Sequence, residues 1–581
     1  MRQNHHTEEN HYSSGSKTGE AGLQHLGAFS TALGYYLMIF FTLVLLILSR
    51  TGVSQNCTYI VNSESGTTII DPEHFPDISP GDVLCFREGP FFQILVQDLH
   101  GQPGNPIILR NLDKQTIISG KTANYGMSVR NCSFLEILGN GNTEIDYGFY
   151  FEEVGAGAGL SLDQLSTDIT VARVEVANTA LSGIVAKTDP DCSFTSTRDK
   201  YTMYNTIIRD NYIHDIGTEG LYIGNSFYNG KLISCGLLDT LVLPHVLEGV
   251  QVFNNIIENT GRNGLQVSSA VQNCKIYNNR ISFDSQSETP NQMGGIQIGG
   301  GSICDCYNNR ISEGKGSGIE VFGRGNFMLY NNLIEYPGRS FKPNEPHYDY
   351  PKHGIFVKHV NTDPEAKIQI FHNTIIFPKS DGILFVNDSL KGSQIKNNII
   401  INPGSFEQIS SDAYVHCDNI ELDVSHNFFT LDIDKAYFTD YFLADYHLKP
   451  FSPAVDQGED LSSFGIDFDF QGCQRPLGKG FDIGAFEADP EDEEASSPTV
   501  KVFPNPFTDH LSVCFLIKNS AEVSLEIFSV DGKRIFEKNL SNLTPGKHKY
   551  DFGFVSLPKG IYLLKVKTMD YTCFQRIVSI N

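Results

Sequence analysis

The chain has 581 residues, of which 40% are hydrophobic and 19% are charged. This composition is typical of folded protein, and the length exceeds that of one compact core, so we expect two or more domains or a repeat array. The formal net charge is −25. Such a charge argues against binding to nucleic acids or to anionic membrane surfaces, because both require basic patches.

Residues 1–54 are predicted to form a signal peptide region. Residues 33–48 (LGYYLMIFFTLVLLIL) carry no charge, and this stretch is short for a membrane span but suits the apolar core of an export signal. Small residues follow in TGVSQ, so we expect cleavage near Ser54 and Gln55. A retained membrane anchor is the alternative. With a cleaved signal, the protein contacts a membrane only through this sequence during export.

The cysteines also fit an exported protein. Twelve are present, and an exported chain with this number is expected to form some disulfides. Location suggests two pairs, Cys57 with Cys85 and Cys192 with Cys235. Cys274 and Cys304 occupy equal places in a repeat, five residues before its second asparagine, and we expect them to stack as core thiols. No cysteine or histidine cluster has zinc-ligand spacing, so no structural zinc site is predicted.

A pair of asparagines recurs within otherwise apolar sequence. The hexapeptide YNNRIS occurs at residues 277–282 and again at 307–312, and YNNLIE begins at Tyr330. The second position of this motif falls at Asn211, Asn255, Asn279, Asn309, Asn332, Asn373, Asn398 and Asn427. The shortest spacings, 23 to 25 residues, define the repeat unit, and the longer ones include insertions. A period in this range indicates stacked supersecondary units.

Each repeat unit contains three short predicted strands, because its apolar residues alternate with a period of two. One strand precedes the asparagine pair, one follows it, and one follows a glycine, as in GLYI at Gly220 and GIEV at Gly318. Three strands of this length wind into a parallel β-helix. The asparagine pair then forms the corner between two strands. Asparagine tolerates the left-handed conformation, and its amide can bond to the asparagine one coil away.

This pattern resembles the right-handed parallel β-helix superfamily, which includes pectate lyases and related polysaccharide enzymes. The resemblance covers roughly residues 56–429, and PGDVLCFREGPF at Pro80 and GQPGNPIILRN at Gly101 resemble the entry coils of such proteins. It implies a β-helix domain over residues 55–435. It does not imply one activity, because this fold hosts lyases, hydrolases, epimerases and adhesins.

Residues 436–487 resemble a terminal segment of exported β-helix proteins, with HLKPFSPAVDQG at His447 and DFQGCQRPLGKGFDIGAFE at Asp469. Its expected role is to close the open end of the helix, because an uncovered strand edge invites association. Five acids are candidate calcium ligands, although we favour ordinary roles in turns. They are Asp456, Asp467, Asp469, Asp482 and Glu487. An acidic linker follows over residues 488–499.

Residues 500–581 form a further predicted domain, in which alternating strands are separated by D-G, P-G and K-G turns. The pattern predicts a small antiparallel, immunoglobulin-like sandwich. The whole chain is therefore predicted to be all-β, a right-handed parallel β-helix followed by this sandwich. The domain closely resembles the type A sorting domain of type IX secretion, on the motif residues Pro504, Asn505, Pro506, Asp531, Gly532, Lys533, Gly560 and Tyr562.

The resemblance to a sorting domain implies a secreted or outer cell-surface protein whose partner is the type IX secretion machinery. It also implies a mature form that ends before Val500. The alternative is an ordinary immunoglobulin-like binding module.

Candidate substrate-binding residues lie on or beside the glycine-led strands. In a G-I-x-V strand the two apolar side chains point inward and x points outward. Long insertions at residues 225–248, 282–293 and 336–352 border this sheet, so we take it as the floor of a cleft. The predicted substrate-binding residues are Tyr222, Arg262, Gln266, Gln297, Phe322, Arg324 and Phe356. This mixture of amides, charges and rings suits a sugar chain.

Glu320 is the acid at the central outward position of these strands and the best acid–base candidate. The other candidate catalytic residues are Lys352, His353 and Lys358, and His359 belongs to the same coil. A lysine or histidine base beside a neutralising cation suits β-elimination of a uronic acid polymer. The alternative is a solvated glutamate paired with a surface lysine. No metal site is predicted, and calcium is the one candidate cofactor.

The sequence therefore supports two functions from different classes. One is a secreted or cell-surface carbohydrate-active protein, with polysaccharide lyase or epimerase chemistry preferred, whose partner is an extracellular polysaccharide or cell-surface glycan. The other is a noncatalytic adhesin or structural protein, which the absence of tryptophan and of a recognised catalytic motif favours. Turnover of a glycan would distinguish them.

Overall fold

The computed structural model describes residues 57–489 and 500–579 with short gaps. The gaps are residues 237, 339–350, 359–365, 387–391, 405–412, 418–421, 504, 506, 508–510, 518–520, 530–532, 553–556 and 569–571. The predicted signal region and most of the acidic linker lie outside the described residues. Within the part that the structure describes, no helix is both long and apolar enough to cross a membrane.

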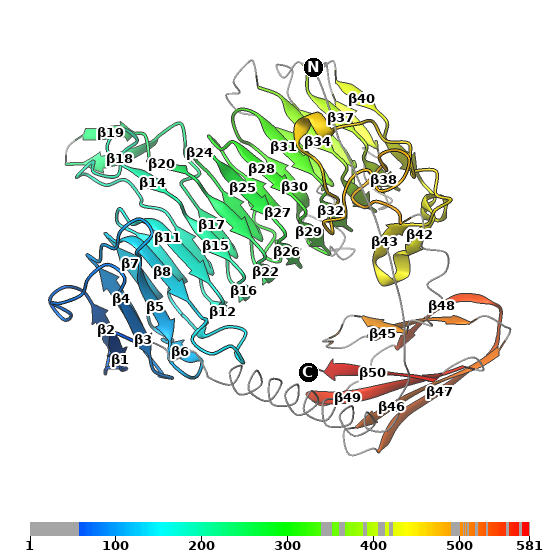
Figure 1. Cartoon of the computed structure of the whole chain (residues 1–581), viewed down its shortest axis with the longest axis horizontal. Helices are drawn as coiled ribbons and strands as arrows, with labels where there is room; N and C mark the ends of the chain where they lie inside the picture. Colours follow the sequence, from blue (N-terminus) through cyan, green and yellow to red (C-terminus); the bar gives the residue numbers. More distant parts are fainter. Residues whose placement is uncertain are drawn as a thin grey trace, which may run out of the picture. The chain divides into compact units, whose positions relative to one another are not determined.

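Residues 59–430 wind into a right-handed stack of coils whose strands form three long parallel sheets (Figure 1). The first sheet has 13 described strands, in spatial order β1 (Tyr59–Val61), β3 (Val83–Phe86), β5 (Ile107–Asn111), β8 (Ser133–Leu138), β11 (Thr167–Ala172), β15 (Ile207–Arg209), β21 (Gln251–Phe253), β25 (Cys274–Tyr277), β28 (Cys304–Tyr307), β31 (Phe327–Tyr330), β34 (Ile368–Phe371), β37 (Gln394–Lys396) and β40 (Asp423–Ser425).

The second sheet contains the glycine-led strands that carry the candidate site. Its 12 described strands are β2 (Thr67–Ile70), β4 (Gln93–Gln97), β7 (Tyr125–Arg130), β10 (Ala158–Asp163), β13 (Ile184–Ala186), β17 (Leu221–Ile223), β23 (Leu265–Val267), β27 (Gly294–Ile298), β30 (Ser317–Val321), β33 (Ile355–Lys358), β36 (Ile383–Val386) and β39 (Val415–Cys417).

The third sheet follows the asparagine corner. Its 11 described strands are β6 (Thr116–Ser119), β9 (Phe149–Glu152), β12 (Val174–Thr179), β16 (Tyr212–Ile216), β22 (Ile256–Thr260), β26 (Arg280–Ser282), β29 (Arg310–Ser312), β32 (Leu333–Glu335), β35 (Thr374–Ile376), β38 (Ile399–Ile401) and β41 (Phe428–Thr430). Two additions interrupt the regular coils. They are a small parallel sheet of β14 (Thr202–Tyr204), β20 (Val246–Glu248) and β24 (Ala270–Gln272), and an antiparallel hairpin of β18 (Lys231–Cys235) and β19 (Leu238–Val242).

The core is built from like residues at equal places in successive coils. Ile296, Ile319, Ile355 and Ile383 pair in register across β27, β30, β33 and β36, and all four are fully buried. Burial of each such side chain stabilises the fold by roughly 1.5–3 kcal/mol. Most strands of the three long sheets contribute buried inward residues, because their side chains alternate between the two faces.

The asparagine corner is a continuous hydrogen-bonded ladder, as predicted. From Asn211 to Asn427, seven hydrogen bonds of 2.9–3.0 Å join the eight aligned asparagines, because the side-chain amide of each but the last donates to the side-chain oxygen of the next. The backbone N–H of each ladder residue, such as Asn309, donates to the same oxygen of its successor. The ladder therefore satisfies buried polar groups that would otherwise lack partners.

The left-handed conformation occurs at the first position of the motif and not at the ladder residue. The residue before it adopts the positive φ, with values of 52–58° along the whole ladder, and Asn308 (54°) is one example. The two positions of the motif thus have separate tasks. The first turns the chain in a conformation that asparagine tolerates, and the second bonds to the neighbouring coils.

Glycine is required at the start of strands in the second sheet. A Cβ atom on Gly318 would lie 2.5 Å from the carbonyl oxygen of Gly354 and 2.5 Å from Cγ2 of Ile334. Neither neighbour can withdraw, because one is backbone of the next coil and the other fills the core. The glycine at the start of such strands therefore lets successive coils approach closely.

Three disulfides form among the described cysteines, and two of them are the predicted pairs. Cys57 pairs with Cys85, and Cys192 pairs with Cys235. The expectation for the other two was wrong, because Cys274 and Cys304 form a disulfide and are not free core thiols. Parallel pairing of β25 with β28 places them side by side, with Cα atoms 4.5 Å apart.

Residues 431–489 form a closing segment with three 3-10 turns and a short hairpin. Its elements are η1 (Ile433–Ala436), β42 (Phe438–Asp440), η2 (Tyr441–Leu443), β43 (Asp445–Leu448) and η3 (Ser462–Phe464). Its apolar residues pack against outward side chains of the third sheet, including Leu333, Ile376 and Ile401. The segment thus covers one side of the helix, a position that its sequence did not indicate.

Carboxylates of the closing segment serve its turns. Asp456 accepts the N–H groups of Lys479 and Gly480, and Asp469 accepts those of Gln471, Cys473 and Glu487. Glu487 lies 2.5 Å from the fully buried guanidinium of Arg475. Asp482 accepts the N–H groups of Asp456 and Ala488. No cluster of three metal-ligating side chains occurs among the residues that the structure describes.

Residues 500–579 form a separate antiparallel sandwich with its own core. One sheet contains β44 (Lys501–Phe503), β45 (Leu511–Ile517) and β48 (Gly546–Phe552), and the other contains β47 (Arg534–Leu543), β46 (Ala521–Ser529), β49 (Gly560–Lys567) and β50 (Thr572–Ser579). Asn505 ties the entry of the domain to β50, because it donates to the carbonyl of Arg576 and accepts the N–H of Val578.

The remaining sorting-motif residues divide into two groups. Tyr562 donates to the carbonyl of Pro558 just before Gly560 opens β49, and the carbonyl of Lys533 accepts the N–H of Ser529. The other four lie outside the described residues; they are Pro504, Pro506, Asp531 and Gly532.

Candidate functional site

The central outward row of the second sheet is continuous. Strand pairing places its members in register in the order Tyr222, Gln266, Gln297, Glu320, Phe356, Leu384 and His416. All but the last follow from alternation in the glycine-led strands. His416 was missed because its strand reads AYVHC, without the glycine that marks the other coils.

Glu320 points out of the coil but is not solvated. Its residue is only 5% exposed, and the site for a Cβ on Gly294 lies 3.2 Å from its Cγ atom. Burial raises the pKa of Glu320 to about 7, and the charge of Asp284 acts in the same direction, while Lys352 and Ser317 oppose them. A carboxyl group with this pKa exchanges its proton near neutral pH.

Asp284 is a second buried carboxyl group that the sequence did not reveal. It follows β26 within the insertion at residues 282–293 and is 1% exposed. A Cβ on Gly314 would lie 1.8 Å from its Oδ2 atom, so the glycines of the EGKGSG loop make room for this side chain. Burial raises the pKa of Asp284 to about 6, against the opposing charge of Lys352.

Lys352 supplies the positive charge of this buried group. Its residue is 9% exposed, and its charge lowers the pKa of both Asp284 and Glu320. Its backbone N–H donates to Oγ of Ser380 at 3.1 Å. Two acids and one cation thus share a poorly solvated space at the start of the second-sheet strands. We call Asp284, Glu320 and Lys352 the buried cluster.

His353 adjoins the buried cluster and contacts a third carboxylate. Its Nδ1 atom lies 3.1 Å from Oδ2 of Asp381, which is itself 3.6 Å from Nδ1 of His416. Burial lowers the pKa of His353, although Asp381 acts in the opposite direction. The Asp381 carboxylate is further held by the N–H of Ala413. A fully buried carboxylate between two imidazoles can orient both rings.

The structure does not bring the fourth candidate, Lys358, into this group. Lys352 and His353 lie just before β33, whereas Lys358 is the last residue of this strand and is exposed. The neighbouring candidate His359 lies outside the described residues. The interpretation that these side chains converge therefore applies to Lys352 and His353 and not to Lys358.

The two glutamines of the outward row are hydrogen-bonded to neighbouring polar side chains. Asn263 is fully buried and donates to Oε1 of Gln266 at 3.2 Å and to Oε1 of Gln297 at 2.5 Å. Gln266 donates in turn to Ser268. These contacts fix the two glutamines on the sheet and occupy part of their bonding capacity.

The charged and aromatic candidates are spread across the second sheet, with Arg262 before its strand, Tyr222 and Phe356 in the central row, and Phe322 and Arg324 after their strand. Arg262 is 3.4 Å from the buried Glu219, and exposed Arg324 donates to the hydroxyl of Tyr228. The rings of Phe322 and Phe356 meet edge to face at 5.8 Å. The Tyr222 hydroxyl lies 2.9 Å from Oγ of Ser226.

The insertions that were expected to form one cleft lie at opposite edges of the second sheet. Residues 282–293 precede β27, whereas residues 225–248 follow β17. All strands of a parallel sheet point the same way, so their first residues lie along one side of the sheet and their last residues along the other. We call these two sides the start edge and the end edge. The buried cluster occupies the start edge, and the hairpin of β18 and β19 belongs to the end edge.

Comparisons with known proteins agree with this architecture. Residues 245–429 match the family model described as the right handed beta helix region, and residues 501–581 match that of the secretion system C-terminal sorting domain. A search of curated proteins gave no match.

Among solved structures, three similar chains come from different proteins. The enzymatically active domain of bacteriophage CBA120 tailspike protein 2 is 9% identical, with a TM-score of 0.31, and 89% of this chain and 72% of that chain are covered. The A-module of the Azotobacter vinelandii mannuronan C-5 epimerase AlgE4 is 16% identical, with a TM-score of 0.26 and coverage of 65% and 92%. XylC in complex with xylose is 11% identical, with a TM-score of 0.31 and coverage of 83% and 96%. At these values no activity carries over to this chain.

The stacked parallel sheets and the two family models agree on the identity of each part. The chain is a right-handed parallel β-helix protein with a C-terminal type IX secretion sorting domain, which directs its export to the cell surface or the extracellular space.

Proposed function

We propose that the β-helix acts on an extracellular polysaccharide, with Glu320 as the group that transfers a proton. The observation that carries this proposal is the buried cluster. A carboxyl group whose pKa is about 7 lies beside a second acid and a lysine, on the outward row of one sheet. Ionisable groups that are held this way without solvent occur preferentially at functional sites.

Lyase or epimerase chemistry fits these groups better than hydrolysis. In a uronic acid polymer, ionised Glu320 would accept the proton on the carbon beside the substrate carboxylate, and Lys352 would neutralise the charge that develops there. In a lyase, the electron pair forms a carbon–carbon double bond and the glycosidic oxygen leaves, taking up a proton. In an epimerase, a proton returns to the opposite face of the same carbon.

The test is turnover by the purified secreted protein. Pectins, alginates and glycosaminoglycans are incubated with wild type, Glu320→Gln and the control Glu136→Gln, which changes a half-buried glutamate on the first sheet. Ultraviolet absorbance detects an unsaturated product, and proton NMR detects epimerised residues. We expect a product from at least one polymer and a loss of 100-fold or more in kcat for Glu320→Gln alone. Absence of any product contradicts the proposal.

A noncatalytic adhesin is the second candidate, and one observation favours it. The amides of Gln266 and Gln297 are engaged by Asn263, and Arg262 pairs with Glu219, so these groups are partly withdrawn from a substrate. This function predicts glycan or cell binding without turnover, and binding that Glu320→Gln leaves unchanged.

A further inference from the structure

A polar groove lies on the second sheet away from the buried cluster. It has a volume of about 760 Å³ and is lined by side chains that include Ser161, Asp163, Val185 and Lys187. This size is within the range of small-ligand sites. Ser161 of β10 pairs in register with Val185 of β13, and both belong to the central outward row that later reaches Glu320.

The groove and the buried cluster are separate sites. Four coils, or about 19 Å at the usual strand spacing, separate Val185 from Glu320 along the row. The two also differ in edge. Asp163 ends β10 and Lys187 follows β13, so the groove opens at the end edge, whereas Asp284 and Lys352 precede their strands.

The outer wall of the groove is residues 188–196, and several contacts fix it. The N–H of Thr188 donates to Nε2 of the fully buried His245 at 3.0 Å, and Oγ1 of Thr188 accepts the N–H of Leu165 at 2.9 Å. The ring of His245 must therefore carry its proton on Nδ1, which lies 3.1 Å from the carbonyl oxygen of Val246. Burial lowers the pKa of His245 and so favours this neutral form.

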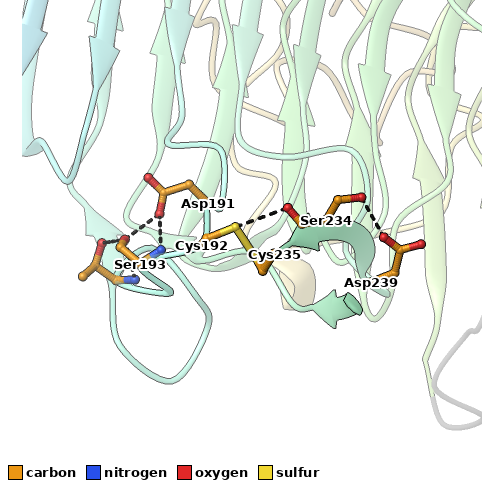
Figure 2. The surroundings of a disulfide bond; sticks show 7 residues. Asp191, Cys192, Ser193, Ser234, Cys235 and Asp239 are labelled. Atoms are coloured by element: carbon orange, nitrogen blue, oxygen red, sulfur yellow. Dashed lines mark hydrogen bonds between the residues drawn. A yellow bond between two sulfur atoms is a disulfide. The ribbon is translucent and has the colours of Figure 1, made fainter. Parts of the chain in front are cut away.

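A disulfide joins the same wall to the hairpin of β18 and β19. Figure 2 shows Cys192 of the wall bonded to Cys235 at the end of β18, with Asp191 and Ser193 beside it. The Asp191 carboxylate accepts the N–H of Ser193 at 2.9 Å, which fixes the turn at the bridge. A wall held at Thr188 and at Cys192 is organised before a ligand arrives, and this reduces the entropy cost of binding.

The lining chemistry is that of a site for hydroxyl groups without negative charge. The lining includes three residues with hydroxyl groups, Ser161, Thr195 and Ser196, and three aspartates, Asp163, Asp189 and Asp191. Lys187 is the cation of this lining, and it is already paired, with Nζ 2.8 Å from Asp189 and 5.0 Å from the centre of the Tyr222 ring. The net negative charge repels a polyuronate or sulfated glycan, and it tolerates a neutral sugar and attracts an amino sugar.

We propose that this groove binds a neutral or amino-bearing sugar unit, and that the bridged wall of residues 188–196 holds it there. The inference does not depend on the chemistry proposed for Glu320. It assigns to the end edge of the sheet a binding site whose charge preference is opposite to that of a uronate-directed cluster.

Isothermal titration of the purified secreted protein tests the groove. The ligands are neutral cello-oligosaccharides, partly deacetylated chito-oligosaccharides and alginate oligosaccharides. Ser161→Trp fills the groove floor without a change of charge, and Thr170→Trp places the same ring on the half-buried outward face of the first sheet as a control. We expect Ser161→Trp to weaken binding of at least one neutral or amino oligosaccharide tenfold or more. Thr170→Trp should bind these oligosaccharides as wild type does, and Ser161→Trp should leave the binding of alginate oligosaccharides unchanged.

Two further variants test the charge and the wall. Asp163→Asn with Asp189→Asn should strengthen binding of alginate oligosaccharides, because it leaves Lys187 without its carboxylate. Cys192→Ser with Cys235→Ser should weaken the neutral or amino ligand severalfold, while circular dichroism reports an intact fold. The proposal is overturned if no neutral or amino oligosaccharide binds. It is also overturned if Ser161→Trp leaves their affinity unchanged or weakens alginate equally.

Turnover separates this result from the function proposed for Glu320. Ser161→Trp should leave any polyuronate turnover unchanged, and Glu320→Gln should leave binding in the groove unchanged.

Discussion

The asparagine corner and the start edge of the second sheet belong to the same coils but are built on different rules. At the corner, each residue has the same partners as its equivalent one coil away, from Asn211 to Asn427. At the start edge, each coil has a different residue, including Asp284, Lys352 and Asp381. Repetition therefore supplies the stability of the fold, and departures from it supply the groups that are capable of chemistry.

The same contrast appears in how polar groups are satisfied. The corner amides are buried and uncharged, and each bonds to its neighbours in a fixed geometry. The start-edge carboxyls are equally buried but ionisable, so burial shifts the pKa of Glu320 to about 7 and that of Asp284 to about 6. A buried amide ladder stabilises at every pH, whereas a buried carboxyl group makes stability depend on pH.

The largest effect is expected from Gly318→Ala, which tests the close approach of coils that both regions require. The new Cβ would meet the carbonyl oxygen of Gly354 and Cγ2 of Ile334 at 2.5 Å each. Overpacking against backbone should lower the free energy of unfolding by about 3 kcal/mol or more, measured by urea denaturation. Gly104→Ala is the control, because a Cβ there meets no atom within 4 Å. Alanine at its positive φ of 73° should still cost about 1 kcal/mol, because only the backbone conformation is strained. Equal effects would contradict the packing argument.

Glu320→Gln should change how stability depends on pH. Glu320 has a pKa near 4.5 when unfolded and about 7 when folded, so between these values the folded protein holds a proton that the unfolded chain has lost. The stabilising contribution is complete below pH 4.5 and is lost as pH rises through 7. The variant does not titrate at this position, so its stability relative to wild type should rise across this window, on the order of 3 kcal/mol.

Thermal and urea unfolding from pH 4 to 9 measure this difference. His353 has a lowered pKa and gives the opposite trend, a loss of stability as pH falls below 6.5, but it is present in both proteins and largely cancels. A difference between variant and wild type that is flat with pH would show that Glu320 is not held in a poorly solvated site.

Asn309→Ala tests the ladder itself. It removes a buried amide that donates to Asn332 and accepts from Asn279, so the partners lose hydrogen bonds at a cost of roughly 1–3 kcal/mol. Asn427→Ala lies at the last rung and is partly exposed, so its cost should be smaller. Differential scanning calorimetry compares the two, and a greater loss of stability at Asn427 would contradict the ladder.

Much of the fold could be predicted because it repeats. The period, the three strands per coil, the amide ladder and every member of the outward row from Tyr222 to Leu384 follow from alternation and spacing. The Cys274–Cys304 disulfide was missed although the two equal places were recognised, because spacing shows that side chains are neighbours and does not show whether their sulfurs bond.

The site could be predicted only in part, for a physical reason. Alternation indicates that Glu320 points out of the coil, but the charged residues that act on it, Asp284 and Lys352, do not belong to the repeated positions and carry no repeat signal. Asp284 lies within the insertion at residues 282–293, and the glycines that make room for it, Gly314 and Gly316, become its neighbours only because β26 pairs with β29. His416 escaped notice because its coil lacks the marker glycine. Where a coil departs from the repeat, its contacts are set by tertiary packing that spacing alone does not describe.

The smallest effect, and the sharpest test of the corner, comes from Asn308→Ala. Asn308 has φ of 54° and turns the chain, while Asn309 makes the ladder bonds. Alanine at position 308 keeps the ladder and incurs the left-handed penalty of about 1 kcal/mol, whereas Asn308→Gly avoids the Cβ clash and should differ from wild type by less than Asn308→Ala does. Urea unfolding of both variants beside Asn309→Ala gives the ranking. Should Asn308→Ala cost more than Asn309→Ala, the first asparagine would be the structural centre of the corner, and the division of tasks between the two positions would be wrong.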